Sequence, residues 1–468
     1  MKLPIAKHSK RIAKLLGDPG LRGRLLSSGS WILGTHSADL AIRLASSLIM
    51  TRLLFPQAFG LMALVLSIQA SLVLISDVGI RLAIVKGVEG ENEEFLQTAW
   101  TVQILRSVAL GTVLTAIAFA IALPYFQALF PKDSTFSDPQ LPSLIAVGAL
   151  ATAIAGFSSV NSHLAVRRLH LRPAFFQNLF GKLFSIPIMV VWAIVDPSVW
   201  ALMAGLVAGS LWNAIASHFV FPGPRMKFRW SKGYAGEMFH SGKWVMVSSA
   251  ANFVTTQADK LLFAVLVTSS TLGLYSIALL LKSSVEGVLQ RLHGNLSLPV
   301  LAETFRERPQ EVRRIYYRFR MPLEIAAFFS GGFLMVSGGK IVELLYDDRY
   351  LAAGWMLEIL AFSLIMYPMQ IIGSSFAASG EIQKQAMLSI MNAFSLILLT
   401  LVGYGLAGFA GAIVGVAVSK LPAGITAIAL AYKRGWIGLV AELRYLPLIG
   451  VGLLAGLFGN WLIDVLQS

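Results

Sequence analysis

The sequence predicts an all-α polytopic membrane protein, and two observations lead to this fold class. The chain has 468 residues, of which 56% are hydrophobic and only 13% are charged, whereas soluble domains carry nearer a quarter of charged residues. Four long runs contain no Asp, Glu, Lys or Arg: 53–76, 107–131, 197–224 and 385–419. Each reaches the roughly 20 residues that a membrane-spanning helix needs. The alternation typical of transmembrane barrel strands is absent from the sequence, so helices are expected.

Charge-poor windows between turn signals predict twelve spans. Before a basic linker at 222–237 we expect spans at 27–54, 58–85, 95–123, 141–165, 173–194 and 199–221. After it we expect spans at 238–267, 271–300, 315–345, 351–378, 385–402 and 407–431. The corner at Pro56 and Gly60 separates the first two spans, and the loop 124–140 separates the third from the fourth. The Gly-rich segment 446–466 is predicted as a thirteenth, C-terminal span.

The even division around the linker predicts two lobes of six helices that form a V with a central cavity. The predicted parts are a basic cytoplasmic N-terminal tail (1–26), an N-terminal lobe (27–221), a basic cytoplasmic linker (222–237), a C-terminal lobe (238–431), and a cytoplasmic segment with the extra helix (432–468). An internal repeat supports the two lobes, because "ASSLIMTRLLFPQAFGLMALVL" from Ala45 aligns without gaps with "ADKLLFAVLVTSSTLGLYSIAL" from Ala258. At this offset of 213 residues Gly60 coincides with Gly273. Two repeats with a site at their interface are typical of secondary transporters.

The distribution of Lys and Arg predicts the orientation of the chain. With the N-terminus in the cytoplasm, the cytoplasmic segments hold 24 Lys and Arg, and the opposite loops hold only Arg52, Lys132 and Arg349. Cytoplasmic loops of membrane proteins are enriched in these residues. The high pI therefore reflects topology, and we expect no nucleic-acid partner.

Ionised residues inside the predicted spans are the candidate site. Each is unfavourable by about 2.5–3.5 kcal/mol at a helix centre on insertion scales, and eleven basic residues exceed seven acidic ones inside the spans. Such a surplus favours a water-filled cavity that accepts an anion. The cations predicted to line it are Arg43, Arg81, Arg106, Lys182, Lys260, Lys282, Arg291 and Lys420. The acids predicted to pair with them or to couple transport are Asp39, Asp77, Asp259 and Glu286.

Three of these charged pairs have i,i+4 spacing, which places both side chains on one helix face. They are Asp39/Arg43, Asp77/Arg81 and Lys282/Glu286. Either each acid only neutralises its neighbour for insertion, or both members face the wet cavity, where the acid can release the cation to a ligand. A further group near the span ends is expected to extend to the lipid headgroups: Lys243, Arg320, Lys340 and Glu343.

Catalytic chemistry is not expected. The sequence has no cysteine, no His/Cys/Asp cluster with metal-ligand spacing, no Gly-rich phosphate loop and no nucleophile elbow. We therefore expect a transporter without a metal or cofactor, and coupling to protons or sodium ions is left open.

Two motifs resemble a known family. "TRLLFPQAFGLMALV" from Thr51 and "LISDVGIRLAIVKG" from Leu74 resemble the polysaccharide transporter family, the Wzx-like lipid-linked oligosaccharide flippases. This family lies within the multidrug/oligosaccharidyl-lipid/polysaccharide exporter superfamily, and it typically has "R-L-L-x-P-x-x-F-G-L" followed by "D-L-G-L-G-x-A-L-V". "LGLYSIA" from Leu272 resembles the second-half counterpart. Arg81 stands where the family often has a small residue, so its role is not carried over.

The resemblance implies a flippase of the bacterial inner membrane that works by alternating access. Its substrate would be an undecaprenyl-diphosphate-linked repeat unit for exopolysaccharide, capsule or O-antigen, the last a part of lipopolysaccharide. Its partners would be membrane lipid, a polysaccharide polymerase and export machinery. One alternative is a multidrug or cation antiporter of the same superfamily, which would need an acidic, aromatic pocket. Another is a membrane glycosyltransferase or polymerase, which would need a large outer loop or a carboxylate-rich site.

Overall fold

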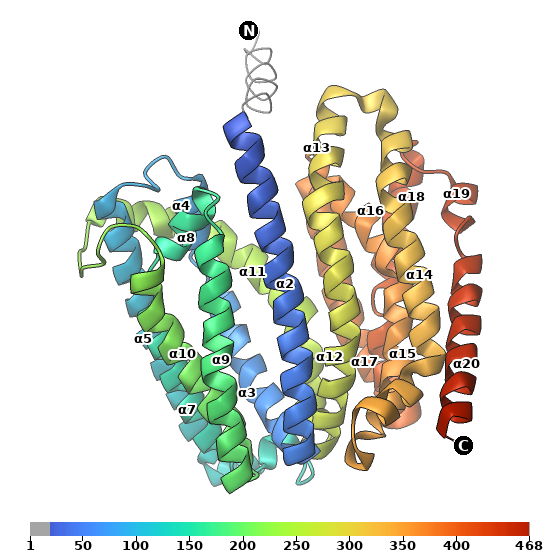
Figure 1. The fold of residues 1–468 in the computed structure, drawn as a ribbon, viewed down its shortest axis with the longest axis horizontal. Helices are drawn as coiled ribbons and strands as arrows, with labels where there is room; N and C mark the ends of the chain where they lie inside the picture. Colours follow the sequence, from blue (N-terminus) through green and yellow to red (C-terminus); the bar gives the residue numbers. More distant parts are fainter. Residues whose placement is uncertain (1–18, 468) are drawn as a thin grey trace. The chain divides into compact units, whose positions relative to one another are not determined.

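The computed structural model describes residues 19–467, and over this range its regular structure is entirely helical (Figure 1). The predicted all-α fold is confirmed, and residues 1–18 of the predicted N-terminal tail lie outside the described residues. The first helices are α2 (Pro19–Leu53), α3 (Pro56–Ile75), α4 (Ile80–Lys86), α5 (Glu93–Ala122), α6 (Pro124–Gln127), η1 (Thr135–Ser137), α7 (Leu141–Gly156), α8 (Asn161–Arg167), α9 (Arg172–Val195) and α10 (Val199–Val220).

The remaining helices follow the basic linker, whose last residues are already helical. They are α11 (Lys232–Leu266), α12 (Ser269–Leu292), η2 (His293–Ser297), α13 (Leu298–Glu307), η3 (Pro309–Glu311), α14 (Val312–Leu345), η4 (Asp348–Tyr350), α15 (Ala353–Ile365), α16 (Tyr367–Ala378), α17 (Ile382–Val418), α18 (Leu421–Lys433), α19 (Leu439–Leu443) and α20 (Pro447–Gln467). A kink with non-helical backbone at Ala407 and Gly408 divides α17. It lies at the start of the predicted span 407–431, just after the expected break that follows 385–402.

Many of the described helices are long and apolar enough to cross a membrane. Eight segments meet this test alone, and ten meet it if each of two bent helix pairs counts as one span. The bent pairs are α7 with α8, at 58°, and α15 with α16, at 42°. The chain is therefore a multi-pass membrane protein.

Four of the predicted spans are not straight helices. The segment 58–85 is broken between α3 and α4, where Gly79 has a φ of 71° in the left-handed region that favours glycine. The segment 271–300 passes through the π-helical turn η2. The segments 141–165 and 351–378 are the two bent pairs, and Pro368 follows the second bend. The bent spans are thus the second and fourth of each predicted set of six, so the internal repeat is visible in the structure as well.

The helices divide into two compact units that do not follow chain order. Unit 1 comprises Met1–Met50, described from Pro19, together with Ile75–Ala120 and Pro142–Val247. Unit 2 comprises Thr51–Leu74, Ile121–Leu141 and Ser248–Ser468, of which Ser468 is not described. Helix α3 therefore belongs with the helices of the second half. The lobe boundaries 27–221 and 238–431 stay a prediction.

A close contact between α3 and α12 explains why α3 belongs to unit 2. A Cβ atom on Gly60 would lie 1.8 Å from the carbonyl oxygen of Ser269, and one on Gly273 would lie 1.8 Å from the carbonyl oxygen of Pro56. Pro56 and Ser269 are related by the same offset of 213 residues as Gly60 and Gly273. The contact is therefore reciprocal, as in a pseudo-two-fold arrangement, and it excludes any side chain at either glycine.

We expect Gly273→Ala to lower the free energy of unfolding by at least about 1–3 kcal/mol, because its Cβ would overlap backbone and force α3 and α12 apart. Denaturant titration of the purified protein measures the loss. Gly287→Ala is the matched control on α12, since a Cβ there meets nothing within 4 Å. A Gly273→Ala protein as stable as the control would contradict the importance of the contact.

Candidate functional site

The predicted site residues are divided equally between the two units. Unit 1 holds Asp39, Arg43, Asp77, Arg81, Arg106 and Lys182, and unit 2 holds Asp259, Lys260, Lys282, Glu286, Arg291 and Lys420. Within the described part of the chain, no group of three or more His, Cys, Asp or Glu could hold a metal ion.

In unit 1, Asp39 pairs with a residue that the spacing of charges did not predict. Its Oδ1 lies 2.9 Å from Nζ of Lys182, which joins α2 to α9. Of the two alternatives for Asp39 and Arg43, neutralisation within the same helix is therefore wrong, because the neighbouring helix supplies the cation. Arg43 is exposed, and among the described residues it has neither an ion pair nor a hydrogen bond. Arg43 is thus available for another ligand.

The second predicted pair of unit 1 is also rearranged. Asp77 lies in the break after α3, where its Oδ1 accepts a hydrogen bond of 2.9 Å from the backbone N–H of Gly79. Arg81 is exposed on the next helix, α4, so the two residues do not share one helix face. Arg106 on α5 donates from Nε and Nη2 to Oγ of Ser76, at 3.1 and 3.0 Å. The break between α3 and α4 is therefore held by a cation from α5.

In unit 2, three predicted residues meet in one buried cluster. Glu286 Oε2 lies 2.5 Å from Nζ of Lys282, one turn away on α12, which confirms their predicted i,i+4 pairing. Glu286 Oε1 lies 2.8 Å from Nζ of Lys420, at the start of α18. Lys282 and Glu286 are each only 9% exposed. With all three groups ionised, this cluster carries a net charge of +1.

A small polar cavity of about 140 Å³ lies beside this cluster, inside unit 2. Lys420 lines it together with polar side chains of α16 and α17, including Gln370, Ser374, Ser389 and Asn392. The Nε2 atom of Gln370 and the Oδ1 atom of Asn392 are buried without a hydrogen-bond partner. Unpaired buried polar atoms are rare in proteins. The cavity thus offers a cation and an unused donor to a polar or anionic group.

The other predicted residues of unit 2 lie outside this cluster. Asp259 is buried on α11, where its Oδ2 accepts a hydrogen bond of 2.6 Å from the hydroxyl of Tyr275 on α12. Lys260 donates to Oε1 of Gln257 at 3.2 Å. Arg291 has a buried Nη1 atom without a partner among the described residues. Asp259 therefore links α11 to α12. The Nη1 atom of Arg291 can still donate a hydrogen bond to a ligand.

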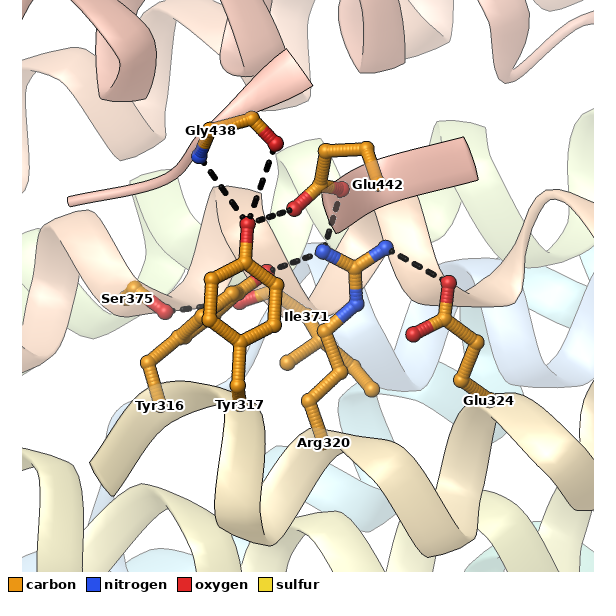
Figure 2. Close-up of polar contacts among 8 residues, drawn as sticks. All are labelled: Tyr316, Tyr317, Arg320, Glu324, Ile371, Ser375, Gly438 and Glu442. Atoms are coloured by element: carbon orange, nitrogen blue, oxygen red, sulfur yellow. Dashed lines mark hydrogen bonds and ion pairs between the residues drawn. The ribbon is translucent and has the colours of Figure 1, made fainter. Parts of the chain in front are cut away.

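A second charged cluster of unit 2 was not predicted from the sequence (Figure 2). Arg320 on α14 contacts Glu324 on the same helix and Glu442 on α19. Arg320 is only 3% exposed, so the prediction that it extends to the lipid headgroups is wrong. The signal in the sequence was the i,i+4 spacing of Arg320 and Glu324. The partner on α19 follows only from packing.

Another unpredicted set of contacts joins the corners of unit 2, and we call it the Asp138 cluster. Asp138 Oδ2 accepts hydrogen bonds from Nε2 of Gln57, at 3.0 Å, and from Oγ of Ser269, at 3.1 Å. Arg349 donates to the carbonyl oxygens of Thr51 and Arg52, both at 3.1 Å. Hydrogen bonds from Arg349 also lower the pKa of Asp347 below its ordinary value. These bonds fasten the α2–α3 corner to segments far away in the chain.

Comparisons with known proteins agree with this architecture. Residues 49–354, more than half of the chain, match the family described as "Polysaccharide biosynthesis protein". The succinoglycan biosynthesis transport protein ExoT of Rhizobium meliloti (strain 1021) is 22% identical over 334 residues, which cover 71% of this chain and 65% of that protein. This chain therefore spans less than two thirds of the length of that relative.

Two solved structures have a similar fold. Lipid II flippase MurJ in an inward closed conformation has a TM-score of 0.67 and 12% sequence identity, with 94% of this chain and 93% of that chain covered. A multidrug resistance MATE family transporter of the MOP superfamily, in an inward-facing conformation, has a TM-score of 0.62 and 15% identity, with 85% and 94% covered. At these identities the similarity establishes the fold alone.

We expect the double variant Asp39→Lys with Lys182→Asp to retain the stability of the native protein, because it preserves the ion pair between α2 and α9. Each single substitution should be less stable, with a coupling of about 1 kcal/mol, since both side chains are partly exposed. Thermal unfolding of the four proteins gives this coupling.

The exchange within α2 is the control. Asp39→Arg with Arg43→Asp leaves Lys182 facing a cation and should not recover stability. Recovery in this second exchange, and none in the first, would contradict the observed pairing.

Proposed function

The chain belongs to the polysaccharide biosynthesis protein family, as the motifs at Thr51 and Leu74 predicted, and from this premise we propose that it is a flippase for lipid-linked oligosaccharides. In this proposal it is a transporter and not an enzyme, which the ExoT transport protein and the fold shared with MurJ and a MATE transporter support. Its proposed substrate is an undecaprenyl-diphosphate-linked repeat unit for exopolysaccharide, capsule or O-antigen. The proposed location is the bacterial inner membrane, with the N-terminus in the cytoplasm.

The observation that carries this proposal is the surplus of cations inside the helices. Arg43 and Arg291 have no partner among the described residues, and the cluster of Lys282, Glu286 and Lys420 has a net charge of +1. A diphosphate is an anion that arginine binds with two hydrogen bonds. The sugar needs a wet cavity, while the polyprenyl chain is soluble in lipid.

The same contacts argue against a multidrug or cation antiporter. Such a protein would need free acidic groups in its cavity. Asp39 is paired with Lys182, Glu286 with two lysines, and Asp259 with the hydroxyl of Tyr275. Polymerase and export machinery are the proposed partners, because a flipped repeat unit must be joined to a chain and exported.

In the proposed alternating-access cycle, the hydrogen bonds of the Asp138 cluster would stabilise one of the two conformations. The predicted topology puts its loops on the periplasmic side, where Asp138 and Arg349 hold corners from different parts of unit 2 together. Opening toward the periplasm would require these hydrogen bonds to break. Because charge-assisted hydrogen bonds are strong, the cluster favours one state over the other.

We expect Arg43→Ala to abolish export while the protein still inserts into the membrane, because the variant loses a free guanidinium that would bind the diphosphate. Translocation of lipid-linked oligosaccharide in membrane vesicles measures the effect, with membrane content checked by immunoblot. Arg308→Ala, in an exposed loop, is the control and should export normally. Full export by Arg43→Ala would refute a role for Arg43 in binding the substrate.

We also expect a disulfide between Phe55→Cys and Thr268→Cys to stop export, and reduction to restore it. These positions precede Pro56 and Ser269, whose carbonyl oxygens are at the close contact of α3 and α12. The chain has no native cysteine, so the introduced pair reports without background. Thr268 caps α12 with its hydroxyl, and the single Thr268→Cys variant therefore controls for the loss of that cap. Export that continues with the bridge formed would argue against movement at this corner.

A further inference from the structure

The cluster of Arg320, Glu324 and Glu442 holds more acid than base in a buried position (Figure 2). Arg320 is 3% exposed, Glu324 is 1% exposed and Glu442 is 9% exposed. Two carboxylates around one guanidinium would have a net charge of −1. An uncompensated charge in such a position is strongly unfavourable, and a buried group usually changes its protonation state instead.

The two carboxyl groups are not equivalent, because Glu442 has the better partners. Its Oε2 contacts Nη1 of Arg320, and its Oε1 accepts a hydrogen bond of 2.8 Å from the hydroxyl of Tyr317. The Tyr317 oxygen is positioned in turn by the backbone N–H of Gly438, at 3.0 Å. Glu442 is therefore the carboxyl group that this environment stabilises as an anion.

Glu324 makes a single polar contact within the described part of the chain. Its Oε1 lies 3.2 Å from Nη2 of Arg320. The Nε atom of Arg320, on the same edge of the guanidinium as Nη2, is buried without a hydrogen-bond partner. An ionised carboxylate normally binds this edge through both nitrogens. The single long contact and the unused Nε are the geometry expected of a neutral carboxyl group at this position.

Within the described part of the chain, no cation other than Arg320 forms an ion pair or hydrogen bond with Glu324. On its own helix Glu324 contacts Arg320, and the buried hydroxyl of Tyr316 accepts a hydrogen bond of 2.8 Å from Nη1 on the other side of the guanidinium. On α16 the hydroxyl of Ser375 donates to the carbonyl oxygen of Ile371 at 2.9 Å, so this contact adds no charge (Figure 2).

The charged groups on the other elements packed against α14 are exposed, paired elsewhere or not bonded to Glu324. Exposed groups are Glu303, Arg306 and Glu307 on α13, Glu311 of η3 and Asp348 of η4. Groups with partners elsewhere are His293 of η2 with Ser374, Lys282 and Glu286 on α12 with Lys420, Arg349 of η4 with Asp347, Glu358 on α15 with the backbone of Gly339, and Asp464 on α20 with Lys340. Arg291 on α12 has no partner among the described residues, and no ion pair or hydrogen bond joins it to Glu324.

We propose that Glu324 is a proton-binding site that couples export to proton movement. Glu324 holds a proton while Arg320 is engaged by Glu442. When α19 moves and withdraws Glu442 from Nη1, Arg320 loses its anionic partner. Glu324 then releases its proton to water and binds Nε and Nη2 of Arg320 as a carboxylate. Each cycle thus breaks one O–H bond on Glu324 and later forms it again from solvent, without any other reactant.

The ligand is a proton and not a metal ion, because the guanidinium of Arg320 already occupies the space between the two carboxyl groups. The described residues also include no group of three acidic or histidine ligands for a metal. The coupling role rests on the proposed transport function, whereas the protonation of Glu324 does not.

Infrared spectroscopy of the purified full-length protein in lipid nanodiscs tests the site directly. At neutral pH we expect a carboxylic acid C=O band that is lost in Glu324→Gln. The band should also be lost in Glu442→Gln, because the remaining pair of Arg320 and Glu324 is balanced when Glu324 is ionised. Glu343→Gln is the matched control on α14, since Glu343 is exposed and paired with Lys340, and it should keep the band. Absence of the band from the native protein, or its persistence in a folded Glu324→Gln protein, would overturn the proposal.

Transport measurements separate this proposal from the flippase function. In proteoliposomes, a pH gradient should accelerate export by the native protein and by Glu343→Gln severalfold, and should have no effect on Glu324→Gln. A sodium gradient should not replace it, and a sodium response that Glu324→Gln abolishes would overturn the choice of ion. If the band behaves as expected but no lipid-linked oligosaccharide moves, the proton site stands and the proposed substrate is wrong. If oligosaccharide moves without any response to pH, the flippase function stands and the coupling role is wrong.

Discussion

An ionised side chain inside a membrane protein needs a partner or access to water, because neither lipid nor apolar side chains can replace its hydration. This constraint explains three of the contacts between helices in the structure. Asp39 and Lys182 join α2 to α9, Glu286 and Lys420 join α12 to α18, and Arg320 with Glu442 joins α14 to α19. In each case the charges connect helices that are distant in the chain. The helices that carry them are thereby held in a defined arrangement within their unit.

The second organising feature is the internal repeat, which appears as helix geometry and as a contact. The second and fourth predicted spans of each half are bent or broken, so the two halves of the chain share one pattern of irregular helices. Gly60 and Gly273 occupy corresponding positions in the repeat and pack against each other's corner. Backbone can approach backbone this closely only without a Cβ atom. The contact brings α3 into the unit formed by helices of the second half.

These features combine in a consistent physical picture of transport. The cations without partners are available to an anionic headgroup, and the acids Asp39, Asp259 and Glu286 are already engaged. In unit 2, the cluster of Lys282, Glu286 and Lys420 has a surplus of positive charge. The cluster of Arg320, Glu324 and Glu442 has a surplus of acidic groups, and we propose that a proton on Glu324 neutralises it. The substrate and the coupling ion would therefore act on separate groups. Such separation allows both to bias the same conformational change.

The sequence by itself determined that this protein lies in a membrane, and it determined the approximate positions of its helices, its family and the Lys282/Glu286 pair. These are local properties, since span length, corner motifs and i,i+4 spacing depend on neighbouring residues. Only the tertiary structure decided that Asp39 pairs with Lys182 instead of Arg43, and that Arg320 is buried against Glu442. A charge on a helix can pair with any helix that packs beside it. Hydropathy and spacing do not encode which helix that is, because many arrangements of apolar helices bury the same surface.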